Sequence, residues 1–427
     1  MIGGIAAGVI ALVVIIGIIF RKPPTPPVHL VVWGVYDDLS VFNDLISNYS
    51  KQNKNVSIKY EQKNPATYEE ELIRAYAEDK APDIWMMQNS WLPKYKTIIT
   101  EIPKTLDELL PFAAFKNTFV DVVEKDFSEN EKIYGLPLYV DTLAMYYNKD
   151  FFNSAGISSP PTTWDELVAD VNVLAKKDQW GNIQRAGVAL GTAGNINRAT
   201  DILELLMLQN GTKMVNDNKT MAIFDESILR NGENYYSGRE ALRFYTDFSN
   251  PSKRTYTWNK EMRYSIDAFI EGKTAIMFNY SHQIPVIKAR APYLNFGIAP
   301  MPQIKDRTFD VNFANYWGFT VSKKSKTQED AWKFIIYLTQ ASNSKKYLEK
   351  TSKPIARRDL LEWQKTDLQL GVFANQSLTA QSWYQIDNAK IETIFSNAID
   401  SVVLGTAAIN KAMETAASQV NLLMRGQ

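Results

Sequence analysis

The sequence predicts an α/β protein built as two lobes, and three observations carry this prediction. The chain has 427 residues, more than a single hydrophobic core usually serves. From residue 28 onward, short apolar segments alternate with amphipathic helical ones, which is typical of a mostly parallel sheet covered by helices. An aromatic stretch at 134–142 separates this set from a second one with the same pattern. We therefore expect two α/β halves joined by a crossing.

The first half begins in the order β-α-β-α-β. Apolar periodicity predicts three strands with two helices between them, at 28–33, 39–49, 56–60, 72–76 and 83–87. Ligands of parallel sheets bind beyond the carboxyl ends of the strands. The loops at 33–37 and 88–91 are therefore candidate site loops, with an ordinary turn as the competing interpretation of each.

The second half begins with a strongly signalled helix. Pro160 and Pro161 block an earlier start, Thr163 can cap the helix, and Glu166 follows three residues later, as in a capping box. The pattern that follows predicts further strands and helices at 187–191, 199–209, 239–248, 267–272 and 273–282.

The order of elements also predicts how the chain divides between the lobes. The buried strand at 273–282 runs into polar and aromatic residues, which favours a return to the first lobe, with two more strands within 295–303 and 315–325. The helical remainder, 327–427, is expected to pack on the second lobe. The expected division is 28–138 plus about 275–325 for lobe 1, and 139–274 plus 326–427 for lobe 2.

The N-terminus is predicted to be a membrane anchor. Residues 2–20 form an apolar run without a charged side chain, which at about 1.5 Å per residue spans roughly the 30 Å hydrocarbon core. A cleaved signal peptide is the alternative, but the run is long and lacks an obvious cleavage site. We expect a single-pass helix at 1–22, a stiff PPTPP spacer at 23–27 and an extracytoplasmic soluble part. Arg21 and Lys22 oppose this orientation, although large domains can translocate despite such charges.

Composition excludes several function classes. Lys plus Arg and Asp plus Glu both number 47, so no basic surface for nucleic acid is expected. The chain has no cysteine and two histidines, which argues against thiol nucleophiles and most transition-metal sites. No motif of a hydrolase, a zinc protease or a nucleotide-binding loop is present. We expect no cofactor, no metal and no enzyme activity, although a pair of catalytic carboxylates stays open.

Aromatic residues make up 12% of the chain, a high share for an ordinary domain. Tyr and Trp suit a site that stacks on flat apolar faces and hydrogen-bonds to their edges. An aromatic-rich core is the equally weighted alternative.

Seven segments carry a family resemblance through their order and spacing: VVWG, APDIWMM, YGLPLYVDTLAMYYNKDFFNSAGISSPPTTWDEL, EALRFYTDF, AFIEGKTAIMFNYSH, FGIAPMP and WGFTVSKKSKTQEDAWKFIIYLT. Together they resemble the extracellular solute-binding proteins of ABC importers, the family that includes maltose-binding and other sugar-binding proteins. The resemblance covers nearly all of residues 28–427. It implies a periplasmic-binding-protein-like fold, whose two α/β lobes close around a ligand and then dock on a membrane permease.

The resemblance also implies which residues line the cleft between the lobes. It points to two loops of the first lobe, three hinge crossings, one polar loop of the second lobe and a late aromatic pair. The expected ligand-binding residues are Trp33, Tyr36, Asn89, Trp91, Tyr139, Asp141, Asn195, Asn197, Arg198, Asn279, Tyr280, Tyr316, Trp317, Trp383 and Tyr384. Aromatic rings would stack on sugar C–H faces, and Asp and Asn side chains would bind hydroxyls.

The resemblance implies a monomeric ectodomain that binds a saccharide and works with permease subunits. Two other functions stay open, namely a sensor or adhesion ectodomain with the same fold and an enzyme that acts on glycans. Peptides and polyamines also stack on Tyr and Trp, so the sequence leaves the ligand open.

Overall fold

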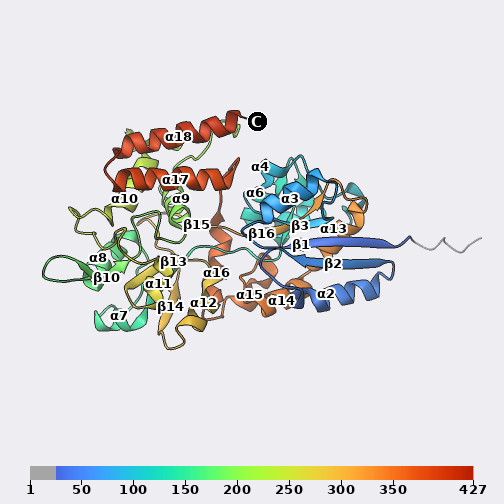
Figure 1. Cartoon of the computed structure of the whole chain (residues 1–427), viewed down its shortest axis with the longest axis horizontal. Helices are drawn as coiled ribbons and strands as arrows, with labels where there is room; N and C mark the ends of the chain where they lie inside the picture. Colours follow the sequence, from blue (N-terminus) through green and yellow to red (C-terminus); the bar gives the residue numbers. More distant parts are fainter. Residues whose placement is uncertain (1–25, 427) are drawn as a thin grey trace, which may run out of the picture.

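The computed structural model describes residues 26–426, which form two lobes side by side (Figure 1). None of the helices within that range is long and apolar enough to cross a membrane. The predicted anchor at 2–20 and most of the spacer at 23–27 lie outside the described residues.

Lobe 1 is built on a mixed sheet with the strand order β2-β1-β3-β16-β4, in which β7 also pairs with β16. β1 is parallel to β2 and β3, whereas β16 is antiparallel to its neighbours. The strands are β1 (Val28–Gly34), β2 (Val56–Gln62), β3 (Ile84–Gln88), β4 (Ile99–Thr100), β7 (Leu136–Pro137) and β16 (Trp317–Ser322). The predicted β-α-β-α-β start is confirmed.

The helices of lobe 1 bury their apolar residues in the same core as the sheet. The helix that begins at Leu39 is capped by Asp38, whose side chain accepts a hydrogen bond from the Ser40 backbone amide. The helices are α2 (Leu39–Gln52), α3 (Tyr68–Ala77), α4 (Leu92–Tyr95), α5 (Phe112–Thr118), α6 (Asp121–Phe127), α13 (Gln328–Leu338), α14 (Ala341–Thr351) and α15 (Leu361–Gln364).

Lobe 2 has a five-stranded sheet with the order β14-β8-β13-β10-β9. Its middle strand, β13, is buried along its whole length, parallel to β10 and antiparallel to β8. The strands are β8 (Ala144–Asn148), β9 (Lys176–Lys177), β10 (Ile183–Val188), β13 (Thr274–Asn279) and β14 (Phe296–Ala299). Two small hairpins lie away from the main sheets, β5 (Ser128–Glu129) with β6 (Lys132–Ile133) in lobe 1 and β11 (Ile228–Arg230) with β12 (Glu233–Tyr235) in lobe 2.

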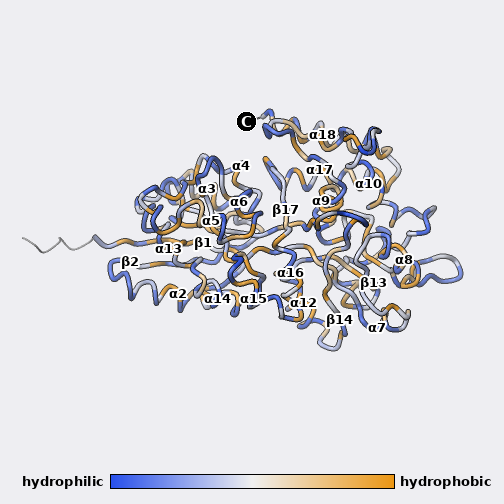
Figure 2. Tube along the Cα trace, turned by 180° about the vertical axis from the view of Figure 1, so that it is seen from behind, coloured by the Kyte–Doolittle hydropathy of each residue, from blue (hydrophilic) through white to orange (hydrophobic). Residues whose placement is uncertain are grey.

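Helices surround the second sheet, and the last two, α17 and α18, lie along one side of lobe 2 (Figure 1). The predicted capping box is confirmed at the start of α8, where Thr163 and Glu166 bond to each other's backbone amides. The helices are α7 (Lys149–Ser154), α8 (Trp164–Leu174), α9 (Ala199–Gln209), α10 (Ser237–Asp247), α11 (Ser265–Ile270), α12 (Gln283–Arg290), α16 (Leu370–Gln376), α17 (Asn388–Val403) and α18 (Ile409–Arg425). Hydrophobic stretches of both lobes lie mainly inward, and hydrophilic ones form the outer loops (Figure 2).

The chain crosses between the lobes three times, and the crossings are hydrogen-bonded to one another. The first follows β7, the second follows β15 (Asn312–Phe313), and the third runs from α15 through α16 to β17 (Ala380–Gln381). The Leu143 amide donates to the Phe313 carbonyl at 3.1 Å, and the Ala314 amide donates to the Gln381 carbonyl at 2.9 Å. The predicted first crossing at 134–142 is confirmed.

The division of the chain between the lobes differs from the prediction in two places. Residues 275–299 were expected in lobe 1, but β13 and β14 belong to the sheet and core of lobe 2. Residues 328–364 were expected on lobe 2, but α13, α14 and α15 pack in the core of lobe 1. Within the range 275–325, only its end, β16, lies in lobe 1 as expected. Strand patterning shows that a segment is buried, but not which sheet supplies its hydrogen-bonding neighbours.

A close approach of α8 to β10 depends on a residue without a side chain. A Cβ atom built on Gly187 would lie 2.6 Å from the Val171 carbonyl oxygen and 2.9 Å from the Val171 Cα. Backbone atoms cannot move aside as a flexible side chain does. We expect Gly187→Ala to lower the free energy of unfolding by about 2 kcal/mol or more, because α8 must shift off the sheet. Urea unfolding followed by circular dichroism measures this difference.

The matched control is Gly194→Ala, because a Cβ atom there meets nothing within 4 Å. This variant should change stability by less than about 1 kcal/mol. Equal stability of the wild type and Gly187→Ala would contradict the packing argument.

Candidate functional site

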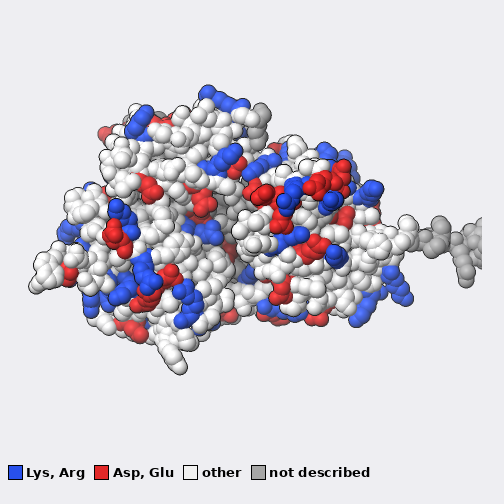
Figure 3. Space-filling view, in the orientation of Figure 1, with Lys and Arg blue, Asp and Glu red and all other residues white. Residues whose placement is uncertain are grey.

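A cavity of about 300 Å³ lies between the lobes, and we call it the first chamber. Both lobes and the hinge contribute to its wall, and the groove between the lobes carries charges of both signs at its edges (Figure 3). The chamber is lined by Tyr36, Gln88, Tyr139, Asp141, Arg198, Tyr280, His282, Asn315, Trp317, Lys353, Asn388 and Glu392.

Aromatic rings form the lobe 1 side of the first chamber. Trp317, at the start of β16, contacts Tyr36 edge to face with ring centroids 5.6 Å apart. Behind it, Trp91 packs against Trp317 at 5.0 Å and holds the indole in place. Tyr36 keeps 49% of its surface exposed, so its ring is available to a ligand. Such a surface suits stacking on the apolar face of a ring-shaped ligand.

A buried ion pair supports this wall. Lys353 Nζ lies 2.7 and 2.8 Å from the two carboxylate oxygens of Asp37, and the Tyr347 hydroxyl donates to the same carboxylate at 2.7 Å. The ammonium group also lies 4.4 Å from the centroid of the Tyr139 ring. Burial lowers the pKa of Lys353, while the neighbouring Asp37 carboxylate opposes that shift. The pair joins the loop after β1 to the segment after α14.

Asp141 lies at the first crossing with both carboxyl oxygens occupied. It accepts hydrogen bonds from the Ser281 amide at 3.1 Å, the Ser281 hydroxyl at 2.7 Å and the Thr142 amide at 2.9 Å. Burial raises the pKa of Asp141 to about 7, although these hydrogen bonds act in the opposite direction. Asp141 therefore holds the crossing together as well as lining the chamber.

Arg198 and Tyr280 bring lobe 2 into the chamber. Arg198 has a left-handed backbone, with φ of 65°, and caps α9. Its guanidinium lies 5.5 Å from the centroid of the Tyr280 ring, whose hydroxyl donates to Asp201 at 2.6 Å. Arg198 Nε is buried and has no hydrogen-bond partner among residues 26–426. An unpartnered buried donor is costly, and an oxygen atom of a bound ligand would supply the missing partner.

Two further titratable groups face the first chamber. Burial, with the charges of Arg198 and Lys353, lowers the pKa of His282 to about 4, so the imidazole is neutral near pH 7. Burial and the nearby Asp201 raise the pKa of Glu392. The chamber thus offers donors and acceptors in a partly dehydrated setting.

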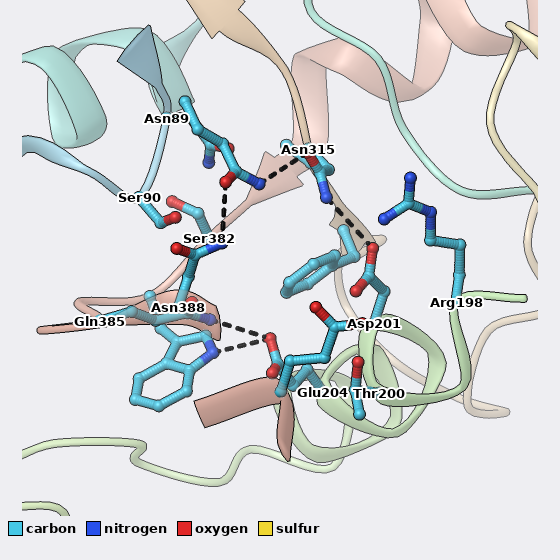
Figure 4. A pocket seen from close by; sticks show the side chains of 15 residues that line it. Asn89, Ser90, Arg198, Thr200, Asp201, Glu204, Asn315, Ser382, Gln385 and Asn388 are labelled. Atoms are coloured by element: carbon cyan, nitrogen blue, oxygen red, sulfur yellow. Dashed lines mark hydrogen bonds between the residues drawn. The ribbon is translucent and has the colours of Figure 1, made fainter. Parts of the chain in front are cut away.

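A second cavity of about 310 Å³, the second chamber, lies beside the first. A narrow space of about 50 Å³, the neck (Figure 4), shares lining residues with both chambers. The indole of Trp383 lies where the neck and the second chamber meet and donates to Glu204 at 2.9 Å, while Gln385 donates to the same carboxyl at 3.1 Å. Burial and the nearby Asp201 raise the pKa of Glu204 well above its ordinary value.

The structure brings nine of the fifteen expected ligand-binding residues to the cavity walls. Six line the first chamber, and the other three line the neck or the second chamber. That these nine residues bind a ligand stays a prediction. The nine are Tyr36, Tyr139, Asp141, Arg198, Tyr280 and Trp317, with Asn89, Trp383 and Tyr384.

Of the six expected residues that do not line these cavities, three belong to lobe 1. The ring of Trp33 is buried in the lobe 1 core, 3.8 Å from Lys63 Nζ. Trp91 lies behind Trp317 and donates to Asn388 at 2.9 Å. The hydroxyl of Tyr316 donates to the buried Asp126 at 2.8 Å. All three side chains are buried, and the resemblance could not show this.

The other three stabilise loops of lobe 2. Asn195 donates to the carbonyls of Asn259 and Met262 at 2.9 and 2.8 Å. Asn279 donates to Asn197 at 2.9 Å, and Asn197 donates to the Tyr264 hydroxyl at 2.7 Å. Their hydrogen-bonding capacity serves the protein, because buried amides need partners.

Several residues that line the first chamber are not among the fifteen expected ligand-binding residues, although Gln88 begins the candidate site loop predicted at 88–91. Gln88 ends β3 and Asn315 immediately precedes Tyr316, so both lie beside positions that the resemblance singles out. Lys353, Asn388 and Glu392 come from distant helical segments. Nothing in the local pattern marks these three, because only folding brings α14 and α17 to the cleft.

Two α/β lobes around a hinged, aromatic and amide-lined cleft define a two-lobed solute-binding protein. Residues 44–369 match the family of bacterial extracellular solute-binding proteins, and the chain belongs to that family. A protein of Brucella abortus described as a binding protein is 25% identical over 325 residues, 73% of this chain and 72% of its own length. The galactooligosaccharide-binding protein of Bacillus subtilis is 23% identical over 410 residues, 93% of this chain and 91% of its own.

Among solved structures, the cyclic alpha-maltosyl-1,6-maltose binding protein of Arthrobacter globiformis is similar, with a TM-score of 0.78 and 20% sequence identity. The similarity covers 94% of this chain and 100% of that one, which shows that the two share a fold.

The raised pKa of Asp141 predicts a stability that depends on pH. Between about pH 4 and 7 the folded protein holds a proton on Asp141 that the unfolded chain releases, so this group's stabilising contribution is lost as pH rises. Between about pH 4 and 7 this loss lowers the free energy of unfolding of the wild type by on the order of 4 kcal/mol. The Asp141→Asn variant should not show this part of the decrease. Urea unfolding at a series of pH values measures it.

The control for this measurement is Asp217→Asn, in an exposed turn of lobe 2, which should keep the wild-type dependence on pH. Parallel wild-type and Asp141→Asn curves over this pH range would contradict the assignment.

Proposed function

We propose that the protein captures a carbohydrate between its lobes and delivers it to the permease of an ABC importer. One observation carries the proposal, namely that the first chamber combines an aromatic surface with amide side chains. Tyr36 and Trp317 present rings, and Gln88, Asn315 and Asn388 line the wall with amides that each keep a second N–H and a second lone pair beyond their bonds within the protein. Sugars have apolar C–H faces and hydroxyl edges, which match these two kinds of contact. The sugar-binding relatives support the same proposal.

We infer that the cleft binds its ligand without chemical conversion. The most buried carboxyl groups, Asp141 and Glu204, already accept hydrogen bonds from Ser281 and Trp383, respectively. Their environments favour the protonated form, since burial raises both pKa values. Such groups are structural acceptors in this setting, and closure of the lobes then holds the ligand.

Trp317→Ala tests the proposed binding surface. The change removes the ring that contacts Tyr36, so sugar affinity should fall at least tenfold because the stacking surface is lost. Calorimetric titration of the wild type against mono- and oligosaccharides identifies a ligand, and the same titration then measures the variant. Trp180→Ala is the control, since Trp180 is 77% exposed on the β9–β10 hairpin. Failure of every sugar to bind the folded wild type would refute the carbohydrate proposal.

We also propose that residues 2–20 anchor the protein in the membrane as a single helix and that PPTPP at 23–27 holds a monomeric ectodomain off the bilayer. The apolar run supports this, together with the position of β1, whose first residues lie at the end of lobe 1 away from lobe 2 (Figure 1). The soluble part of a family member of this kind works outside the cytoplasm.

Replacing Val13 and Ile16 by Lys tests the anchor. Each lysine at the centre of a membrane helix costs about 3 kcal/mol, so the double variant should leave the membrane fraction that survives an alkaline wash. Thr25→Lys, in the spacer, is the control and should stay membrane-bound. Recovery of the wild type in the soluble fraction would contradict the anchor, and a dimer in size-exclusion chromatography would contradict the monomer.

A further inference from the structure

The cleft is divided, and this division bears on ligand size. The linings of the first chamber and the second chamber have no residue in common. The neck shares residues with both, so it is the connection between them. Chambers of about 300 and 310 Å³ thus meet at a space of about 50 Å³. A space of that size has room for ordered water, at about 30 Å³ per molecule, but not for a sugar ring.

A row of hydrogen bonds between the lobes narrows the connection on the side of the first chamber. Asn388, the first residue of α17, accepts from the Trp91 indole at 2.9 Å and donates to Gln88 at 2.7 Å. Gln88 donates to Asn315 at 3.2 Å, and Asn315 donates to Asp201 at 3.3 Å. Figure 4 shows Asn388 and Asn315 in the wall of the neck, with Asp201 below. We call Gln88, Asn315 and Asn388 the amide bridge.

The second chamber would otherwise suit further sugar units. Trp383 and Tyr384 line it, and the side chains of Lys96 and Lys219 stand around it. Asp126, at its border, accepts hydrogen bonds from Asn89 at 2.9 Å and from Ser382. An oligosaccharide that occupied both chambers would have to pass through the neck, which the amide bridge lines.

We propose that the amide bridge makes this protein selective for short saccharides of one or two units, held in the first chamber. The inference rests on the proposed function, because it concerns the length of the carbohydrate bound in the same cleft. The volume of the first chamber lies at the lower end of the range for ligand pockets, about 300–1,000 Å³. Removing the amides at positions 88 and 388 joins the two chambers and admits longer chains.

The test uses the full chain in detergent and measures dissociation constants for pairs of a disaccharide and a tetrasaccharide. The pairs are maltose with maltotetraose, mannobiose with mannotetraose, and galactobiose with galactotetraose. For the pair that binds, the wild type should favour the disaccharide at least tenfold. In Gln88→Ala/Asn388→Ala this preference should fall at least tenfold, because the neck is open. The ratio between the two ligands corrects for any general loss of affinity or stability.

Lys94→Ala is the matched control. Lys94 Nζ forms an ion pair with Asp387 at 3.1 Å across the lobes but does not line the neck. This variant loosens closure and should keep the preference of the wild type. If the preference for the disaccharide fell equally in Lys94→Ala, closure of the lobes, and not the neck, would set the length of the bound saccharide.

Two other results separate this inference from the proposed function. A wild type that binds tetrasaccharides as tightly as disaccharides would overturn the amide bridge as a length limit and leave carbohydrate binding intact. A wild type that binds no sugar of either length would overturn both.

Discussion

The three hydrogen-bonded crossings are the constraint on which the rest of the structure depends. Segments that are far apart in the sequence meet where the Leu143 amide bonds to Phe313 and the Ala314 amide bonds to Gln381. The backbone amide of Asn315 also donates to the backbone carbonyl of Asp141 at 3.1 Å. Each lobe has its own core, so only these strands and the contacts across the cleft set the relation between the lobes. A rotation at the crossings would open or close the cavities without disturbing either core.

The charged groups beside the hinge are buried, and most of them have hydrogen-bond or ion-pair partners within the protein. Asp126, whose pKa burial raises to about 6, and Asp141 both lie where chain segments of different origin meet. Each is surrounded by donors, because a buried carboxyl without partners would be costly. The Asp37–Lys353 pair follows the same rule at the wall of the first chamber. Arg198 is different, since its buried Nε has no partner within the described chain. The contrast separates buried charges whose partners lie in the protein from one whose Nε is left without a partner among residues 26–426.

The aromatic residues occupy both of the places considered from composition, the lobe cores and the wall of the cleft. Trp85, Trp258 and Trp332 are fully buried in the lobe cores. Trp317 and Tyr36 instead face the first chamber, and Trp91 supports them from behind. The core packing and the binding surface are therefore continuous on the lobe 1 side. Preorganisation of this kind reduces the entropy that a ligand must lose to be held.

Much of the fold could be predicted from local pattern. The alternation of strands and helices, the capping box at Thr163 and Glu166, and the first crossing are all visible along the chain, because each depends on residues near one another in sequence. The strand that became β13 was also predicted, but its assignment to lobe 1 was wrong. Its neighbours β8 and β10 are more than 80 residues away, and pairing over that distance leaves no local mark.

The residues of the candidate site likewise fall into those that the sequence could predict and those that it could not. Tyr36, Asp141 and Trp317 lie next to strand ends or at a crossing, so sequence pattern and family resemblance together could place them at the cleft. Asn388 and Lys353 could not be placed, because only the packing of α17 and α14 brings them there. The amino-acid sequence thus determined the elements, the two-lobed class and part of the cleft wall, through interactions of short range. Tertiary structure alone decided the sheet partners, the amide bridge and the division of the cleft, because these depend on contacts between segments as distant as Gln88 and Asn388.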